Sequence, residues 1–444
     1  MQASTPHPHA PDVEGVPHTI APGDIAVGVV IGRTSEYFDF FVYGIASVLV
    51  FPSVFFPFAQ PLEGTLRSFA VFSLAFIARP IGSFLFMGLQ RRHGRGAKLT
   101  AALLLLGAST AGIAFLPGYA DYGVLAIALL SVFRVTQGLA LGGSWDGLPS
   151  LLALSAPPGK RGWYAMTGQL GAPLGFILAA GLFAFLYGEL APEDFLAWGW
   201  RYPFYVALAV NVVTMFARLR LVVTHEFDQL FNERELAPSD NLEFFRSQGY
   251  MVLLGAFGAL ASYALFHLVT VFPLSWIVLH SRQSIVQFLL TEMLGAVLGA
   301  GGIVASGLIA DRIGRRKTLG LLAILIAVFS GFAPTLLTGG ILGEDVFILV
   351  GFVLLGLSYG QAAGAMNAGF EPRFRYTGAA LTSDLAWMFG AGFAPLVALG
   401  LSSYFGLGYV SLYLLSGAAG TLLALRINRD QDADQALLSR AFGR

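Results

Sequence analysis

The sequence predicts an all-α polytopic membrane protein with 12 transmembrane helices, arranged as two six-helix bundles around a central cavity. Three observations predict it: the composition, the spacing of the apolar stretches and an internal repeat. Of the 444 residues, 56% are hydrophobic and 12% are charged, whereas soluble domains carry about 25% charged residues. The mean hydropathy is +0.71. A chain of this composition has to bury much of its surface in lipid.

The apolar stretches give the helices in order. A hydrocarbon core about 30 Å thick needs about 20 apolar residues per helix. Stretches of that length lie at residues 25–50, 67–90, 97–117, 122–149, 164–187, 200–222, 250–277, 285–309, 317–338, 345–369, 378–402 and 406–426. The one long polar connection, residues 223–249, divides them into a first half at 25–222 and a second half at 250–426. We expect each half to form one six-helix bundle.

The tails and loops predict the orientation. Residues 1–24 are polar and rich in Pro and His, without the basic start and apolar core of a signal peptide, so we expect a disordered tail that is retained. Residues 427–444 form the second tail. The even-numbered connections, residues 223–249 included, and the C-terminal tail hold 20 Lys or Arg when the adjoining helix ends are counted, and the opposite loops with their helix ends hold three. This bias predicts that both termini, and the connection between the halves, are cytoplasmic.

A short loop sequence occurs twice. "RHGR" (Arg92 to Arg95) and "RIGR" (Arg312 to Arg315) are 220 residues apart, each after the second helix of its half. Repeated signatures in a chain of six plus six helices indicate a duplicated bundle that moves around a central cavity by alternating access.

Several motifs resemble those of the major facilitator superfamily over about residues 25–426. They are "GLIADRIGRR" (307–316), "RVTQG" (134–138) and "EPRFRYTG" (371–378). "EYFDFFVYG" (36–44), "ARPIG" (78–82), "GGSWDG" (142–147) and "GQLGAPLG" (168–175) resemble the metabolite:proton symporters of that superfamily, which include organic acid, shikimate, α-ketoglutarate and proline-betaine permeases.

This resemblance implies a secondary active transporter, not an enzyme, that imports a small organic acid by proton symport. It implies a monomer in the plasma membrane, the inner membrane of a bacterium, without cofactor or metal. An anion exchanger or facilitator of the same fold, or a symporter of a zwitterion such as a betaine, remains the alternative. The zero net charge gives no broad attraction to nucleic acid, and the absence of cysteine excludes thiol catalysis and disulfides.

The loop signature predicts a gate. Asp311 can accept hydrogen bonds from exposed N–H groups at a nearby helix start. Arg312, Gly314, Arg315 and Arg316 complete the expected gating set, and anchoring of the topology by positive charge alone is the alternative. Arg91 stands where the first-half copy should have its acid, so we expect a weaker latch there. In "GGSWDG", Ser144 and Asp146 replace the Glu and Gly that the symporters usually have.

Charged residues inside the membrane cost about 2.5–3.5 kcal/mol each on insertion scales, so they are functional or paired. The first half holds Arg33, Arg79 and Arg134 together with Glu36, Asp39 and Asp146. The second half holds Glu292 and Asp384, with His267 as its only candidate cation. We expect at least one of these two acids to be neutral when it is sealed from water.

Glu36, Asp39 and Tyr43 share one helix face, because they are three and seven residues apart. We expect Asp39 to face Arg134, and a substrate carboxylate that occupies Arg134 would let Asp39 take the coupled proton. A static ion pair is the alternative. Glu36 can instead pair with Arg33, one turn earlier. Arg79 is either a substrate-facing cation or a partner of Asp146.

The candidate site is therefore defined as two sets of residues. The proton-coupling candidates are Asp39, Glu36, Asp384 and Glu292. The substrate-binding candidates are Arg134, Arg79, Tyr43, Trp145, Gln137 and His267. We expect Arg134 to be the main carboxylate anchor and Arg79 a weaker one, and for His267 a hydrogen-bonded interior histidine is the alternative.

Overall fold

The computed structural model describes residues 22–441 except 158, 223–224, 234–235 and 367–369, so the predicted tail lies almost wholly outside the described residues. Within them every regular element is a helix. The first half contains α1 (Pro22–Leu49), α2 (Phe51–Phe55), α3 (Pro61–Phe115), α4 (Tyr119–Tyr122), α5 (Val124–Gly143), α6 (Leu148–Leu154), α7 (Arg161–Thr167), η1 (Gly168–Leu170), α8 (Gly171–Glu189), α9 (Pro192–Ala197), η2 (Gly199–Arg201) and α10 (Tyr202–Val222). The connection contains α11 (His225–Glu233). The second half contains α12 (Asn241–Gly258), α13 (Leu260–Thr270), α14 (Phe272–His280), α15 (Ile285–Ile313), α16 (Arg315–Leu337), α17 (Gly340–Met366), η3 (Pro372–Phe374), α18 (Arg375–Ala386), η4 (Trp387–Gly392), α19 (Ala394–Phe405) and α20 (Gly408–Ala441).

The helices account for the 12 predicted membrane crossings. Ten continuous segments among the described residues are long and apolar enough to cross a membrane. One of them, α3, is two crossings joined at Gly94, whose backbone is not helical (φ 85°). The remaining crossing is α1, in which every window of 18 residues contains Arg33, Glu36 and Asp39. The C-terminal helix α20 continues through the predicted tail to Ala441.

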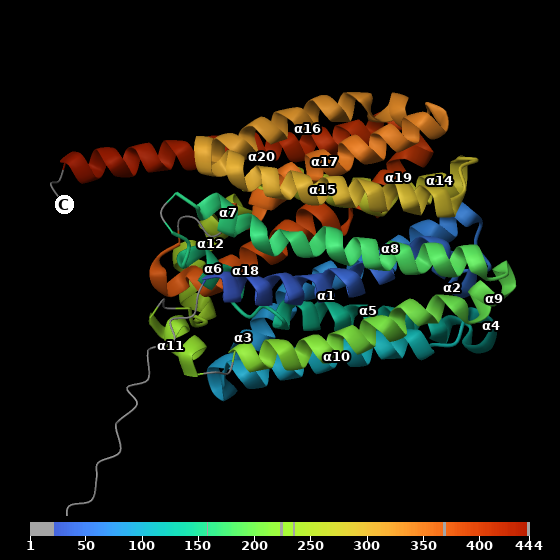
Figure 1. Cartoon of the computed structure of the whole chain (residues 1–444), viewed down its shortest axis with the longest axis horizontal. Coiled ribbons are helices and arrows are strands. Elements are labelled where there is room, and N and C mark those ends of the chain that lie inside the picture. Colours follow the sequence, from blue (N-terminus) through green and yellow to red (C-terminus); the bar gives the residue numbers. More distant parts are fainter. Residues whose placement is uncertain (1–21, 158, 223–224, 234–235, 367–369, 442–444) are drawn as a thin grey trace, which may run out of the picture.

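The two halves lie side by side along the long axis of the molecule, with α1, α3, α5, α8 and α10 on one side and α15, α16, α17 and α20 on the other (Figure 1). Helices α1 and α8 pack together, and α8 packs in turn against α15 of the second half. Large apolar side chains such as Phe185, Val213 and Val328 stay exposed on the outer surface, where lipid covers them in a membrane.

The two ends of the bundle differ. We call one the basic end, because it carries the turns at Gly94 and Gly314 and the exposed Arg91, Arg92 and Arg312; it is the left end in Figure 1, near α6, α7 and α11. At the opposite end a vestibule of about 470 Å³ opens between the halves. It is lined by the ends of α1, α8 and α14 and by the start of α15.

Four crossings are interrupted along their length. The fourth breaks between α5 and α6, the fifth has a 3-10 turn at η1, the seventh breaks at Ala259 and Val271, and the eleventh contains the π-helix η4. The break at Val271 lies two residues before Pro273, the second residue of α14, which lacks the backbone N–H that a continuous helix needs. Irregular backbone at membrane depth persists where it is buried in protein or lines a cavity, and π segments are frequent at functional sites.

Candidate functional site

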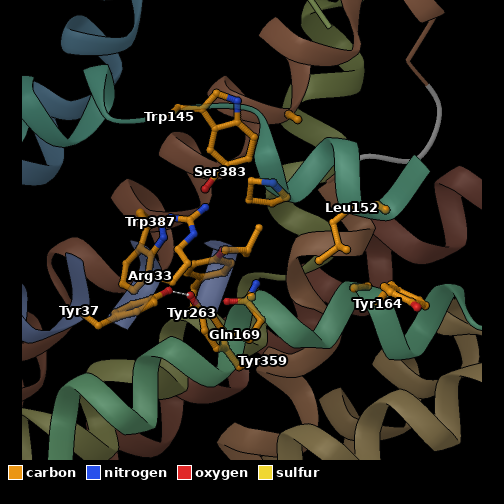
Figure 2. A pocket seen from close by; sticks show the side chains of 16 residues that line it. Arg33, Tyr37, Trp145, Leu152, Tyr164, Gln169, Tyr263, Tyr359, Ser383 and Trp387 are labelled. Atoms are coloured by element: carbon orange, nitrogen blue, oxygen red, sulfur yellow. Dashed lines mark hydrogen bonds between the residues drawn. The ribbon is translucent and has the colours of Figure 1, made fainter. Parts of the chain in front are cut away.

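Three of the interruptions surround one small central cavity, shown in Figure 2. Its principal side chains are Arg33, Tyr37, Trp145, Tyr164, Gln169, Tyr263, Tyr359, Ser383 and Trp387, from both halves of the chain. The free volume is about 30 Å³, which is enough for one or two water molecules. A substrate therefore has to widen the cavity when it binds.

The cavity is closed between the halves by aromatic side chains. The hydroxyl groups of Tyr37 and Tyr359 form a short hydrogen bond across the two halves (Figure 2). The guanidinium group of Arg33 lies 5.5 Å from the centre of the Trp145 ring. A second small cavity shares Arg33, Tyr37 and Trp387 with the first and adds Arg79.

A chain of ion pairs begins at Arg33. The Arg33 guanidinium lies 2.9 Å from the Glu36 carboxylate. This is the pairing, one helical turn apart, that the sequence offers as the alternative for Glu36. Glu36 is also 2.8 Å from Arg218, which is 2.7 Å from Asp146. Arg218 is not among the predicted site residues, because the predicted orientation counts it with the cations of the loops. Its position inside the apolar stretch 200–222 was the signal that could have identified it.

Arg79 and Asp384 form an ion pair between the two halves. Their nearest atoms are 2.7 Å apart, and the hydroxyl of Ser83 donates a second, very short hydrogen bond to the same carboxylate. Of the two readings of Arg79, the one that pairs it with Asp146 is therefore wrong, and Asp384 is not isolated. The sequence could not show this pair, because spacing along a helix says nothing about which residues meet across two bundles.

Asp39 and Arg134 do not form the direct pair that we expected. The Asp39 carboxylate accepts a 2.8 Å hydrogen bond from Thr110. Thr110 accepts from the Gln137 amide at 3.0 Å, and the Gln137 oxygen accepts from Arg134 at 3.2 Å. No ion pair within 4.0 Å involves either Asp39 or Arg134 in the described part of the chain. The two groups are joined by a relay of two neutral side chains.

Arg134 is enclosed rather than exposed to the cavity. Its guanidinium group lies 3.9 Å from the centre of the Tyr43 ring and 4.8 Å from that of Phe72, and it donates to the Phe72 carbonyl at 3.1 Å. One guanidinium nitrogen of Arg134 and the hydroxyl of Tyr43 have no hydrogen-bond partner among the described residues. Arg134 is 1% exposed, so a substrate reaches it only after the aromatic rings have moved.

The remaining candidates of the second half are fully buried. The His267 ring stacks on Phe40 at 5.2 Å and lies 3.3 Å from the Thr270 hydroxyl, while its other ring nitrogen has no partner in the described structure. Neither carboxylate oxygen of Glu292 has a hydrogen-bond partner among the described side chains. Glu292 is thus not hydrogen-bonded to His267.

The loop signature of the second half contacts the first half at the basic end. The Asp311 carboxylate accepts hydrogen bonds from the backbone N–H groups of Gly162 at 2.6 Å and Trp163 at 3.2 Å, which are at the start of α7 in the first half. The chain turns at Gly314 (φ 85°), with Arg312, Arg315 and Arg316 beside the turn. Asp311 therefore holds the N-terminus of a helix from the other half, as expected from its chemistry.

Comparisons with known proteins agree with this architecture. Residues 40–395 match the family model of the Major Facilitator Superfamily. The chain is 38% identical to an inner membrane metabolite transport protein of Escherichia coli K12 over 412 residues, 91% of this chain and 94% of the relative. It is 30% identical to the shikimate transporter of the same organism over 416 residues, 91% and 94% of the two chains.

Solved structures show the same fold. A D-xylose-proton symporter superposes with a TM-score of 0.68 over 91% of this chain and 96% of that one, at 17% identity. The relatives are transporters of small molecules and not enzymes. The chain is therefore a multi-pass membrane protein and a secondary transporter of metabolites, and it belongs to the major facilitator superfamily.

Proposed function

We propose that the protein imports a small organic carboxylate together with a proton by alternating access. The observation that carries this proposal is the Arg79–Asp384 ion pair, because it joins the two halves beside a cavity that Arg33 also lines. The names of two relatives support it: one transports shikimate, which is a carboxylate, and one couples D-xylose to protons. In this proposal the protein is a monomer in the inner membrane of a bacterium, with the basic end and both termini in the cytoplasm.

The substrate carboxylate binds Arg79 in place of Asp384. Arginine presents a planar fork that holds a carboxylate through two parallel hydrogen bonds. Arg33 lies in the same cavity and supplies a second cation, while Tyr37 and the Trp145 ring supply flat walls for the rest of the molecule. Release of Asp384 from Arg79 removes a contact between the two halves, so substrate binding promotes their movement relative to each other.

Charge balance favours a proton as the coupling ion. The charged side chains that form the ion pairs beside the cavities and the two ends of the relay are Arg33, Arg79, Arg134 and Arg218 with Glu36, Asp39, Asp146 and Asp384. Four positive and four negative groups cancel. A substrate with one carboxylate would leave one uncompensated negative charge in a medium of low dielectric constant, which is costly. One proton bound with it restores the balance.

We assign that proton to Asp39. Its carboxylate accepts a hydrogen bond from Thr110 and has no ion-pair partner among the described residues, so it can alternate between charged and neutral forms without breaking an ion pair. The relay through Thr110 and Gln137 places Arg134 two side chains away. Arg134 thus stabilises the charged form of Asp39 from a distance, and does not hold the substrate.

The experiment that tests the function is uptake into proteoliposomes from a panel of radiolabelled carboxylates and betaines, with and without an inward proton gradient. We expect accumulation of one or more monocarboxylates, only with the gradient and without dependence on an imposed membrane potential. Potential-driven accumulation of a zwitterion would support the betaine alternative. Exchange of a carboxylate for another anion without response to pH would make the protein an exchanger.

The other two acids provide the next prediction. Asp384→Asn is expected to keep gradient-driven accumulation and to lower the KM severalfold, because the substrate no longer competes with a carboxylate for Arg79. Glu292→Gln is the companion change, since Glu292 makes no ion pair and no hydrogen bond among the described side chains. This variant should leave both the gradient-driven accumulation and the KM unchanged. Initial rates and accumulation ratios of purified variants measure both effects. Loss of accumulation in either variant would move the proton site to the second half.

A further inference from the structure

Tyr376 fits into a polar socket in the other half of the molecule. It is the second residue of α18, and its side chain is 0% exposed. The hydroxyl lies 2.8 Å from the Gln90 oxygen, 2.7 Å from the Lys98 ammonium and 3.0 Å from the Trp145 carbonyl. Gln90 and Lys98 lie on either side of the Gly94 turn of α3, so one second-half side chain connects three crossings of the first half.

The break between α5 and α6 creates this socket. The carbonyl of Trp145 is free to accept from Lys98, and lies 3.0 Å from the Tyr376 hydroxyl, because the helix stops at Gly143. Gly147 has a positive φ of 80°, and a Cβ atom at Gly147 would lie 2.7 Å from a ring carbon of Tyr376. The backbone there leaves room for the tyrosine ring, and a larger residue would displace it.

Lys98 depends on Tyr376 being in place. Its side chain is 1% exposed, and no carboxylate within 4.0 Å pairs with it in the described part of the chain. A buried ammonium group that lacks hydrogen-bond acceptors carries a large free-energy cost. Here its acceptors are the Trp145 carbonyl and the Tyr376 hydroxyl. If α18 withdraws, Lys98 loses one of these two acceptors until water replaces it.

The two loop signatures close the basic end by different chemistry. In the second half Asp311 holds the start of α7. Arg91 takes the corresponding place in the first half and instead donates to the carbonyl of Ser239 at 2.7 Å. No carboxylate of that loop can hold the start of α18. The residue before Arg91 is Gln90, which accepts from Tyr376.

We propose that the Tyr376 socket replaces the missing acid and acts as the first-half latch of the basic end. The tyrosine hydroxyl, Gln90, Lys98 and the Trp145 carbonyl form one cooperative cluster that stabilises the conformation closed at this end. Transport requires Tyr376 to leave the socket in each cycle. Phenylalanine at position 376 keeps the ring and removes only the hydroxyl that joins the cluster.

The chain has no cysteine, so paired spin labels can report the opening of this end directly. His93→Cys and Lys317→Cys place one label at each loop, at exposed positions outside the socket. Double electron–electron resonance in lipid nanodiscs then gives the distance distribution. Tyr376→Phe and Lys98→Met are each expected to raise the population of the long distance at least threefold. The long-distance population of the double variant should exceed that of the more strongly affected single variant by less than a factor of two.

Two controls calibrate the measurement. Tyr413→Phe removes a hydroxyl that donates to the Gly390 carbonyl within the second half, and it should leave the distribution unchanged. Asp311→Asn weakens the other latch and should open the same end. Gln90→Met tests the cluster if Lys98→Met fails to fold. A distance distribution for Tyr376→Phe equal to that of Tyr413→Phe would overturn the proposal. The proposal would also be overturned if the long-distance population of the double variant rose by the product of the two single increases. The second change in that double variant is Lys98→Met or, if that variant does not fold, Gln90→Met.

Discussion

Asp39→Asn is expected to abolish gradient-driven accumulation and to retain exchange of labelled for unlabelled substrate. Asparagine keeps an oxygen that accepts the hydrogen bond of Thr110, so the relay to Arg134 stays in place. Asparagine cannot bind or release a proton. Residue 39 is therefore always neutral in this variant, as Asp39 is when the carrier holds substrate and proton. The halves then move only with substrate bound, which permits exchange but not net uptake.

The comparison that checks this is the ratio of counterflow to gradient-driven uptake in one batch of proteoliposomes. The ratio should rise at least 100-fold in Asp39→Asn. Asp121→Asn is the matched control, because Asp121 is exposed at the opposite end of the molecule; its ratio should equal that of the unmodified protein. Normal accumulation in Asp39→Asn would remove this residue from proton coupling.

Arg79→Lys is expected to weaken substrate binding at least tenfold. Lysine keeps the positive charge but offers no planar fork, so the two parallel hydrogen bonds to a carboxylate are lost. The same change also weakens the contact with Asp384, which the empty protein makes at 2.7 Å. The loss therefore appears in the dissociation constant and not only in the rate of transport.

Equilibrium binding to the purified variants measures this effect. Arg67→Lys is the matched control, because Arg67 lies on the same helix, is exposed and forms an ion pair only with Glu63 among the described residues. The affinity of this variant for substrate should equal that of the unmodified protein. Arg134→Lys separates the two candidate anchors. A larger loss of affinity in Arg134→Lys than in Arg79→Lys would return the carboxylate anchor to α5, where the sequence analysis placed it.

The fold was predictable from the sequence because the membrane constrains it strongly. Each crossing needs an apolar stretch of about 20 residues, and each of the 12 expected stretches overlaps helices in the described part of the chain. The role of Asp311 was also predictable, since a carboxylate at a helix start satisfies free N–H groups whichever helix supplies them. The continuation of α20 to Ala441 was not, because polar residues predict a tail and a helix equally well.

The candidate site was predictable as a set of residues but not as a set of pairs. Arg33 with Glu36 was accessible because both lie on one helix, three residues apart. Arg79 with Asp384 and the Tyr376 socket join residues between 231 and 305 positions apart, and no spacing along the chain encodes them. The relay between Asp39 and Arg134 depends on Thr110, a residue without charge that no motif singled out.

The central claim is that one proton enters with each substrate carboxylate. Proteoliposomes that contain a pH-sensitive dye, with potassium and valinomycin to hold the membrane potential at zero, allow both fluxes to be measured together. Addition of substrate outside, without a preset pH gradient, should acidify the lumen by one proton for each molecule of monocarboxylate taken up, and this ratio should not change with the membrane potential. Uptake of the carboxylate with no change in luminal pH would contradict the account.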